Sequence, residues 1–447
     1  MSSTVIPPVP TVREAHEAFV SGHSGSSAVE LIQAVWVVFP ALVVTAIVVQ
    51  RRVGWWWFMG ECVIIVLPLV LSFTSMANYT MEMWLAMTAL AASSLYLVSQ
   101  LHIPYTKSGY VDKKRIGCVT SLRGMLNLVT TVAILAVDFR SFPRRFAKTE
   151  EYGYSLMDMG AIGFVIVNGV VEGRKRCNLW IVVKDVVMLT VLGVGRLWLT
   201  RMADYQHHIT EYGLHANFFF TLAFIKLSCS WWAWRLKIGG AVGVAVCLCV
   251  CHHLWLTTGG GEALVFGPAP RDTLFLANRE WVVSMPGYLA SYFMGLALGS
   301  YIFSSSVRNN TPKLTNMMVG LAVCLFGCVL ALHNYLGPPS RRLANPTFVL
   351  FAMFFSILAL AHYLVAETLV SSFLPGLSAV PVVFHAINQR PLLCFLLANV
   401  TTGIINKTIN TLTVDYPWDV CIIATYTLGI TAWLAACTRN TALTPSG

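Results

Sequence analysis

The sequence predicts an all-α polytopic membrane protein with about thirteen transmembrane helices, a non-cytosolic N-terminus and a cytosolic C-terminus. Of its 447 residues, 56% are hydrophobic and only 11% are charged. Soluble domains carry about 25% charged residues, so this balance is typical of a membrane protein. The apolar residues also lie in runs of roughly 20, which is the length that a helix needs to cross the hydrocarbon core.

Thirteen apolar runs are the predicted spans. They lie near 31–50, 57–75, 81–100, 118–137, 155–171, 185–200, 215–234, 239–257, 281–303, 316–335, 347–370, 391–409 and 418–437. The stretch 366–390 can hold either a re-entrant piece or a separate short span. No repeat of fixed period is visible, although transporters often show matched broken helices. We therefore expect an N-terminal segment (1–30), one transmembrane domain (31–437) and a tail (438–447).

The distribution of Lys and Arg predicts the topology. Loops after odd-numbered spans, with the C-terminal tail, hold sixteen of these residues, whereas the N-terminal segment and loops after even-numbered spans hold eleven. The positive-inside rule then places the C-terminus in the cytosol and the N-terminus on the far side. Four of the eleven lie in one loop, 138–154. This exception indicates a second role for its cations, and binding of lipid headgroups is the simpler alternative.

Charge and cysteine usage narrow the function classes. The net charge of +10 comes from basic residues in short loops without an RNA- or DNA-binding motif, so no nucleic-acid partner is expected. The twelve cysteines lie mostly in apolar runs, which is typical of reduced, packed thiols. The run Cys247, Cys249, Cys251, His252 and His253 superficially resembles a metal site. On a helix, however, Cys249 points away from Cys247 and Cys251, so no metal is expected there.

The polar residues next to the spans gather at one face. Polar side chains at membrane depth are costly unless they are paired or face a cavity. Most of them lie where even-numbered spans end and odd-numbered spans begin, which predicts one polar cavity on the non-cytosolic side. The candidates for substrate binding are Arg140, Arg144, Arg145, Glu211, His215, Asn278, Arg279, Arg341, Arg342 and Asn399. Asn399 lies inside a span together with Asn406, and hydrogen bonding between helices is the plainer explanation of such amides.

The segment AVDFRSFPRRFAKTE, at 136–150, has the residue types that acyl transfer to a hydroxyl needs. Asp138 can accept or orient the hydroxyl proton as a general base. Lys148 can stabilise the oxyanion that forms on the attacked carbonyl. The three arginines of the segment can hold phosphate through forked hydrogen bonds.

The identity of the general base stays open at this point. Burial raises the pKa of an aspartate, whereas nearby Arg and Lys lower it, and the sequence does not say which effect is larger for Asp138. His215 is the alternative base, because its unperturbed pKa lies near 6.5. An interfacial histidine with only a structural partner is the other explanation of His215.

At these residues the sequence resembles the PIG-W/GWT family, the inositol acyltransferases of glycosylphosphatidylinositol (GPI) anchor synthesis. The matching blocks are EAFVSGHSGSSAVEL (17–31), AILAVDFRSFPRRFAKTEEYGYSLMDMG (133–160), LGVGRL (192–197), HHITEYGLHANFFFTLAFIKL (207–227), LFLANRE (274–280), SRRLANPTF (340–348) and LLANVTTGIIN (396–406). They follow the family's order and span nearly the whole chain. The second block is long and idiosyncratic, which makes it the most specific.

The resemblance implies an enzyme of the endoplasmic-reticulum membrane with about thirteen spans, a lumenal N-terminus and a lumenal active site. Its reaction would move a fatty acyl chain, typically palmitoyl, from palmitoyl-CoA to the inositol 2-hydroxyl of glucosaminyl-phosphatidylinositol. Within the family's VDF…RRFAK motif, the catalytic Asp and Lys fall here on Asp138 and Lys148. Acyl-CoA would be a substrate, no cofactor is implied, and membrane lipids rather than an obligate protein partner would surround the chain.

Two other classes compete with this interpretation. A lipid or solute transporter can have a similar polar cavity, but it usually carries charged or broken helices near the bilayer midplane. Here the charges gather at one face, which favours an enzyme. A scaffold subunit of a membrane complex is the second rival, and it leaves the dense charge of 138–154 unexplained.

Overall fold

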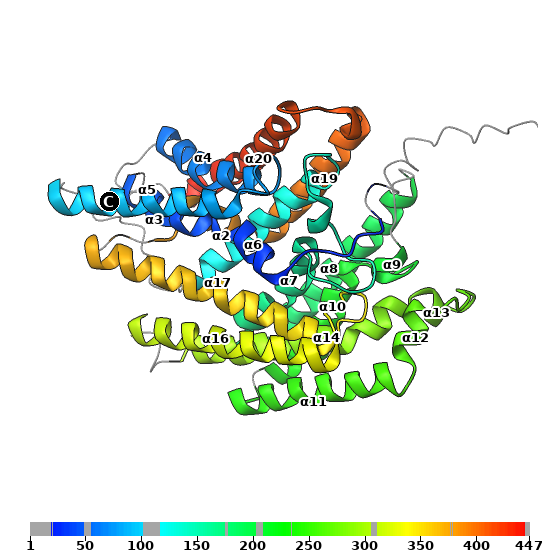
Figure 1. The fold of residues 1–447 in the computed structure, drawn as a ribbon. Coiled ribbons are helices and arrows are strands. Elements are labelled where there is room, and N and C mark those ends of the chain that lie inside the picture. Colours follow the sequence, from blue (N-terminus) through cyan, green and yellow to red (C-terminus); the bar gives the residue numbers. More distant parts are fainter. Residues whose placement is uncertain are drawn as a thin grey trace, which may run out of the picture.

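The computed structural model is a bundle of helices (Figure 1). It describes residues 21–48, 55–101, 117–174, 178–202, 209–233, 235–304, 311–375 and 379–442, together with residues 19 and 377. None of these residues forms a strand, and one isolated bridge joins Ser26 with Tyr154. The prediction of an all-α chain is therefore confirmed for the described part.

Helices lie at each of the thirteen predicted positions. Those of the first half are α2 (Ala28–Trp36), α3 (Val38–Val48), α4 (Trp55–Ser72), α5 (Thr80–Leu101), α6 (Gly117–Ala136), α7 (Leu156–Glu172) and α8 (Leu179–Met202). Those of the second half are α10 (Phe218–Ala233), α11 (Ile238–Thr257), α14 (Arg279–Ile302), α16 (Thr311–Leu336), α17 (Pro346–Phe373), α19 (Pro391–Thr408) and α20 (Trp418–Ala442). The first predicted span comprises both α2 and α3, because Pro40 has no N–H to offer the Trp36 carbonyl.

Nine of the described helical segments are long and apolar enough to cross a membrane, so the chain is a polytopic membrane protein. The other four predicted spans are too short or too polar to meet this criterion. α7 and α10 have only 17 and 16 residues, α8 carries Lys184, Asp185 and Arg196, and α19 is rich in Asn and Thr. The count of thirteen spans and the orientation of the termini stay predictions.

The centre of the bundle is α14, which packs against α7 and α11, while α16 packs against α17 (Figure 1). Small residues allow the close approach of α7 and α14. A Cβ added to Gly299 would lie 2.1 Å from the Val170 carbonyl oxygen, and one added to Gly295 would lie 2.2 Å from that of Ile166. This spacing of glycines lets two backbones meet, as in membrane helix pairs generally.

The uncertain stretch 366–390 contains a short buried helix rather than a further span. α17 continues to Phe373, and α18 (Val382–Gln389) follows inside the bundle against α6. Eight residues rise only about 12 Å, so α18 is too short to cross the bilayer. Glu61 of α4 accepts a hydrogen bond from the Val383 N–H at 2.7 Å and so caps the start of α18.

Candidate active site

The loop between α6 and α7, residues 137–155, contains the predicted catalytic segment. Its aromatic side chains Phe139, Phe142 and Phe146 are fully buried. They recur every three or four residues in FRSFPRRF, and the last of them belongs to a single 3-10 turn, Arg144–Phe146. Burying three large aromatic rings anchors the loop in the core, because each removes roughly 150–250 Å² from solvent. The polar residues between them are thereby held in place.

Arg144 holds the loop together through hydrogen bonds to its backbone. Its Nη2 donates hydrogen bonds to the carbonyl oxygens of Val137, Phe139 and Phe142 at 2.9, 3.1 and 2.8 Å. Its guanidinium also lies over the Phe19 ring, 4.0 Å from the centroid. Burial lowers the pKa of Arg144 to about 10, although the Asp138 charge opposes the shift, so the side chain is charged at neutral pH. These donors hold carbonyl groups of the loop rather than facing outward, and phosphate binding by Arg144 stays a prediction.

The segment before α2 pairs with the end of the loop. Ser26 N donates to the Tyr154 carbonyl oxygen at 2.7 Å, and Glu150 N donates to that of His23 at 3.0 Å. Gly153 makes the contact possible, because its φ is +136° and a Cβ there would lie 2.0 Å from the Ser24 carbonyl oxygen. The N-terminal block of the sequence is therefore part of the wall of the site.

Residues 337–345, between α16 and α17, cover the loop from another side. Ser340 Oγ donates to the Glu151 carbonyl oxygen at 2.5 Å, and Gly153 N donates to that of Pro339 at 2.8 Å. Arg341 is buried and reaches Asp158 of α7, with Nε 2.9 Å from Oδ1. Burial acts to lower the pKa of Arg341, but the negative charges around it, first that of Asp158, raise it above its ordinary value.

The same Asp158 fixes the residue next to Lys148. Its Oδ2 accepts hydrogen bonds from Thr149 Oγ1 at 2.6 Å and from Thr149 N at 3.2 Å. A chain of contacts thus runs from Arg341 through Asp158 to the backbone beside the predicted catalytic lysine. Such neighbours restrict the position of a reacting group, which is what catalysis by orientation requires.

Asp138 lies just beyond the end of α6 and is 9% exposed. Asn406 of α19 donates a hydrogen bond from Nδ2 to its Oδ2 at 2.7 Å. Burial raises the pKa of Asp138 to about 6, while the Asn406 hydrogen bond and the charges of Arg144 and Lys148 oppose the shift. Burial therefore outweighs the neighbouring cations, and the carboxyl titrates close to the range that suits a general base.

Lys148 forms an ion pair with Glu211, which belongs to α9 (Ile209–Tyr212). The Lys148 side chain is 37% exposed, whereas that of Glu211 is 14% exposed. The positive charge of Lys148 also acts to lower the pKa of Asp138. The structure thus brings three predicted residues into one electrostatic group. The Lys148 side chain is partly exposed, which a group that contacts substrate needs to be.

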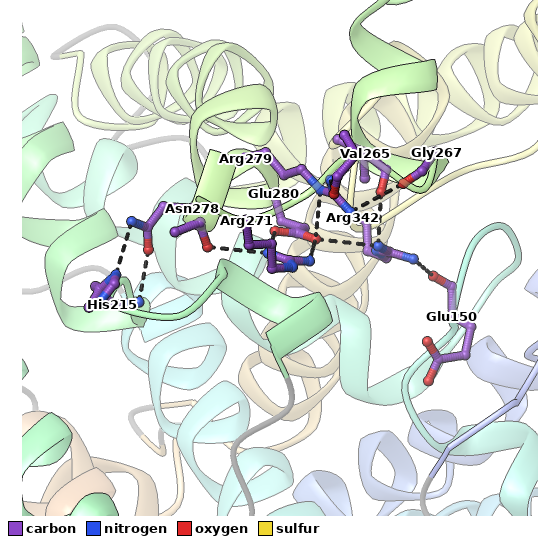
Figure 2. A network of polar contacts seen from close by, with 11 residues as sticks. Glu150, His215, Val265, Gly267, Arg271, Asn278, Arg279, Glu280 and Arg342 are labelled. Carbon is purple, nitrogen blue, oxygen red and sulfur yellow. Dashed lines mark hydrogen bonds and ion pairs between the residues drawn. The ribbon is translucent and has the colours of Figure 1, made fainter. Parts of the chain in front are cut away.

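A second cluster surrounds Glu280 at the start of α14 (Figure 2). Glu280 is fully buried and pairs with Arg271 at 2.5 Å, Arg342 at 3.5 Å and Arg279 at 3.7 Å. Arg342 also donates to the Glu150 carbonyl oxygen at 3.2 Å, which links this cluster to the 137–155 loop. Arg279 also donates to the Ala269 carbonyl oxygen at 2.7 Å, so phosphate binding by Arg279 and Arg342 stays a prediction.

His215 belongs to a neighbouring group (Figure 2). Asn278 Oδ1 accepts hydrogen bonds from His215 N at 2.8 Å and from Ala216 N at 3.1 Å. The His215 side chain is exposed. Among the described residues, the interactions that set the pKa of Asp138 include Lys148 and Arg144 but not His215. Which of Asp138 and His215 acts as the base stays a prediction.

The remaining candidates are spread more widely. Arg145 forms an ion pair with Glu30 of α2 and donates to Asn78 Oδ1 at 2.6 Å. Arg140 is exposed on the loop. Asn399 donates to the Phe395 carbonyl oxygen of its own helix at 2.8 Å. Of these three, Arg140 is the one whose side chain is open to a phosphate.

Two important side chains were not among the predicted site residues. Asn406 is in the same polar span as Asn399, two turns further along the helix, and it is the amide that reaches Asp138. Asp158 lies in the most specific matching block, and its contact with Arg341 joins segments that are far apart in the sequence. Only the block match pointed to Asp158. Among the described residues, no group of three or more His, Cys, Asp or Glu is arranged to hold a metal ion.

Comparison with known proteins agrees with the resemblance. A protein-family model described as GWT1 matches residues 12–437. "GPI-anchored wall transfer protein 1" of Schizosaccharomyces pombe is 36% identical over 67% of each chain. "Glucosaminyl-phosphatidylinositol-acyltransferase PIGW" of Bos taurus is 28% identical over 93% of this chain and 95% of its own. The protein of the same name from Homo sapiens is 27% identical over the same shares.

Proposed function

This chain belongs to the GWT1 family, and from that premise we propose that it is an acyltransferase that acylates the inositol of glucosaminyl-phosphatidylinositol in GPI-anchor synthesis. The relatives named for this activity match it over nearly their whole length. We further propose palmitoyl-CoA as the donor and the 2-hydroxyl as the acceptor position. The observation that carries the proposal is the buried Asp138, which accepts a hydrogen bond from Asn406 and interacts electrostatically with Lys148.

The reaction follows from these groups. The Asp138 carboxylate takes the proton of the inositol hydroxyl as its oxygen attacks the thioester carbonyl carbon. A C–O bond forms, and the carbonyl π electrons move to oxygen. When the oxyanion collapses, the C–S bond breaks and CoA leaves as thiolate. The proton on Asp138 then passes to that sulfur, so the carboxylate is restored and no covalent acyl-enzyme is needed.

Lys148 stabilises the oxyanion. Its ammonium is paired with Glu211, and the Lys148 side chain is more exposed than that of its partner. The ammonium would turn from Glu211 toward the oxyanion, and one such donor is worth about 10²–10³ in rate. Asp158 accepts two hydrogen bonds from Thr149 and so restrains the backbone next to Lys148.

The positive groups around the site hold phosphate. Arg140 is exposed on the 137–155 loop, and the arginines around Glu280 contact the same loop through Arg342 and the Glu150 carbonyl oxygen. Both acyl-CoA and the acceptor lipid bear phosphates, and guanidinium groups bind these through paired hydrogen bonds. We place the enzyme in the endoplasmic-reticulum membrane with this face in the lumen. A transporter is the rival, and it would leave both substrates chemically unchanged.

The test is an acyl-transfer assay with purified full-length protein. Radiolabelled palmitoyl-CoA and glucosaminyl-phosphatidylinositol are supplied in nanodiscs, and acylated inositol is separated by chromatography. We expect product from the wild type and from Asp272→Asn, which changes an exposed aspartate, and no measurable product from Asp138→Asn or Lys148→Ala. Wild-type protein that binds both substrates without forming product would contradict the proposal.

A further inference from the structure

A groove lined by residues of α19 and α20 has no role in the chemistry described so far. Its volume is about 650 Å³, within the range of ligand pockets, roughly 300–1,000 Å³. Thr401 and Ile405 line it from α19, and Trp418, Gly429 and Trp433 line it from α20. The lining is mainly apolar, so an apolar chain would replace bilayer lipid there without loss of polar contacts.

The groove begins beside Asp138. Ile405, a lining residue, immediately precedes Asn406, whose amide donates to Asp138. Tyr426, on the opposite wall, is within electrostatic range of the same carboxylate and donates a hydrogen bond to the Ala398 carbonyl oxygen at 3.1 Å. The groove therefore lies close to the proposed reaction centre.

The groove is long enough to hold one acyl tail. Its lining on α20 runs from Trp418 to Trp433, which corresponds to about 22 Å at the rise of an α-helix. The tails of one leaflet span about half of the hydrocarbon core, or roughly 15 Å. Trp418 and Trp433 are 69% and 47% exposed, so the groove is open along the side that faces lipid.

A cation stands at the end of the groove near Asp138. Lys407 directly follows Asn406 in the last turn of α19, and its side chain is exposed. Trp418, at the start of α20, lies at the same end, where tryptophan typically marks the headgroup level. An anionic group bound by Lys407 would thus lie one residue from the amide that holds Asp138.

We propose that this groove binds an acyl tail of the lipid acceptor, with the lipid phosphate beside Lys407 and the inositol over Asp138. This inference rests on the proposed function. An acceptor lipid has its phosphate and inositol between its tails and the reacting hydroxyl, which fits a cation between the groove and the carboxylate. The donor fits less well, because its acyl chain begins at the reacting carbonyl itself. Lateral opening also lets a membrane lipid enter directly from the bilayer.

The experiment fills the groove without disturbing the fold. A Cβ added to Gly429 meets no atom within 4 Å, so Gly429→Leu projects into open space. Gly327 of α16 is matched, because its added Cβ also meets nothing within 4 Å and it lies outside the groove. Each full-length variant is assayed in nanodiscs with the lipid acceptor and with its headgroup fragment, glucosaminyl-inositol phosphate, which lacks the tails.

We expect Gly429→Leu to raise the KM for the lipid acceptor about tenfold and to leave the KM for acyl-CoA unchanged. Turnover of the headgroup fragment should be equal in wild type, Gly429→Leu and Gly327→Leu. Lys407→Gln should raise the KM of both acceptors, because both carry the phosphate. An unchanged acceptor KM in Gly429→Leu, or a raised KM for acyl-CoA instead, would overturn the inference.

A binding measurement separates this inference from the reaction itself. The lipid acceptor with a photoreactive diazirine in one tail is cross-linked to the wild type, and the labelled peptides are identified by mass spectrometry. Labels in α19 and α20 that are lost in Gly429→Leu support the groove even if no acyl transfer is detected. Labels on other helices exclude it even in an active enzyme.

Discussion

Replacement of Asp138 by asparagine tests whether the Asp138 carboxyl group has a catalytic or a structural role. Burial raises the pKa of this carboxyl from an ordinary 3.8 to about 6. Because a folded-state pKa above the unfolded value disfavours the ionised native state, the charge costs stability at neutral pH. Two units correspond to about 3 kcal/mol. The asparagine introduced by Asp138→Asn has no charge to bury, and its carbonyl oxygen can still accept the hydrogen bond from Asn406.

We therefore expect Asp138→Asn to be inactive and more stable than the wild type at pH 7.5. With an unfolding entropy of roughly 2 cal/mol/K per residue, about 3 kcal/mol raises the Tm of a chain of 447 residues by about 3 °C. The difference should shrink as pH falls through 6 and vanish below about pH 4, where the carboxyl is protonated in both states. Thermal unfolding of the purified protein across this pH range measures it.

Two results would refute this reasoning. If Asp138→Asn unfolds at a lower temperature than the wild type at pH 7.5, the ionised carboxylate stabilises the fold and its role is structural. If the stability gap does not change with pH, the cost does not come from ionisation. Asp138→Ala is the control, because it removes the charge but also leaves the Asn406 amide without this acceptor, and it should be less stable than Asp138→Asn.

Further predictions concern the groups around Asp138. Acyl transfer should fall as pH drops through about 6. The Asn406 hydrogen bond stabilises the ionised carboxylate, so its loss in Asn406→Ala should raise the pKa of Asp138 and move the midpoint of the pH profile upward. An unmoved midpoint would exclude Asp138 as the titrating group. Arg341→Met and Asp158→Asn should each destabilise by about 3–5 kcal/mol and the double variant by less than their sum, as a thermal double-mutant cycle would show. Additive losses would mean no coupling. Arg144→Lys should lower Tm, because an ammonium cannot reproduce the forked contacts with three carbonyl groups; an unchanged Tm would contradict that role.

The sequence identified the helices and the segment that carries the proposed chemistry. Apolar runs of about 20 residues were sufficient, since each predicted span coincides with a helix. The 137–155 loop stood out through its concentration of charge, and the Lys148 charge lowers the pKa of Asp138, whereas the catalytic roles of both residues stay predictions. Local composition determines these features, so they can be read without tertiary information.

Partners could not be predicted in the same way. Arg341 and Asp158 are far apart in the sequence, and no local pattern couples them. Arginine commonly binds phosphate, yet the Arg144 guanidinium donates to carbonyl groups of its own loop. The stretch 366–390 is ambiguous in sequence because its apolar residues do not show where α17 ends and α18 begins. These outcomes depend on which surfaces meet after the chain has been packed.

The contact between Ser340 and Glu151 has a consequence for the timing of biosynthesis. These residues are 189 positions apart, and ribosomes add roughly 5–20 residues per second. The 137–155 loop therefore emerges about 10 to 40 s before the segment that covers it. During that interval Thr149 and Asp158 lack Arg341, so the nascent chain carries the reactive residues in an unfinished enclosure. Acyl transfer would begin only after α17 has been inserted, and a ribosome that stalls before residue 337 would release an inert membrane protein.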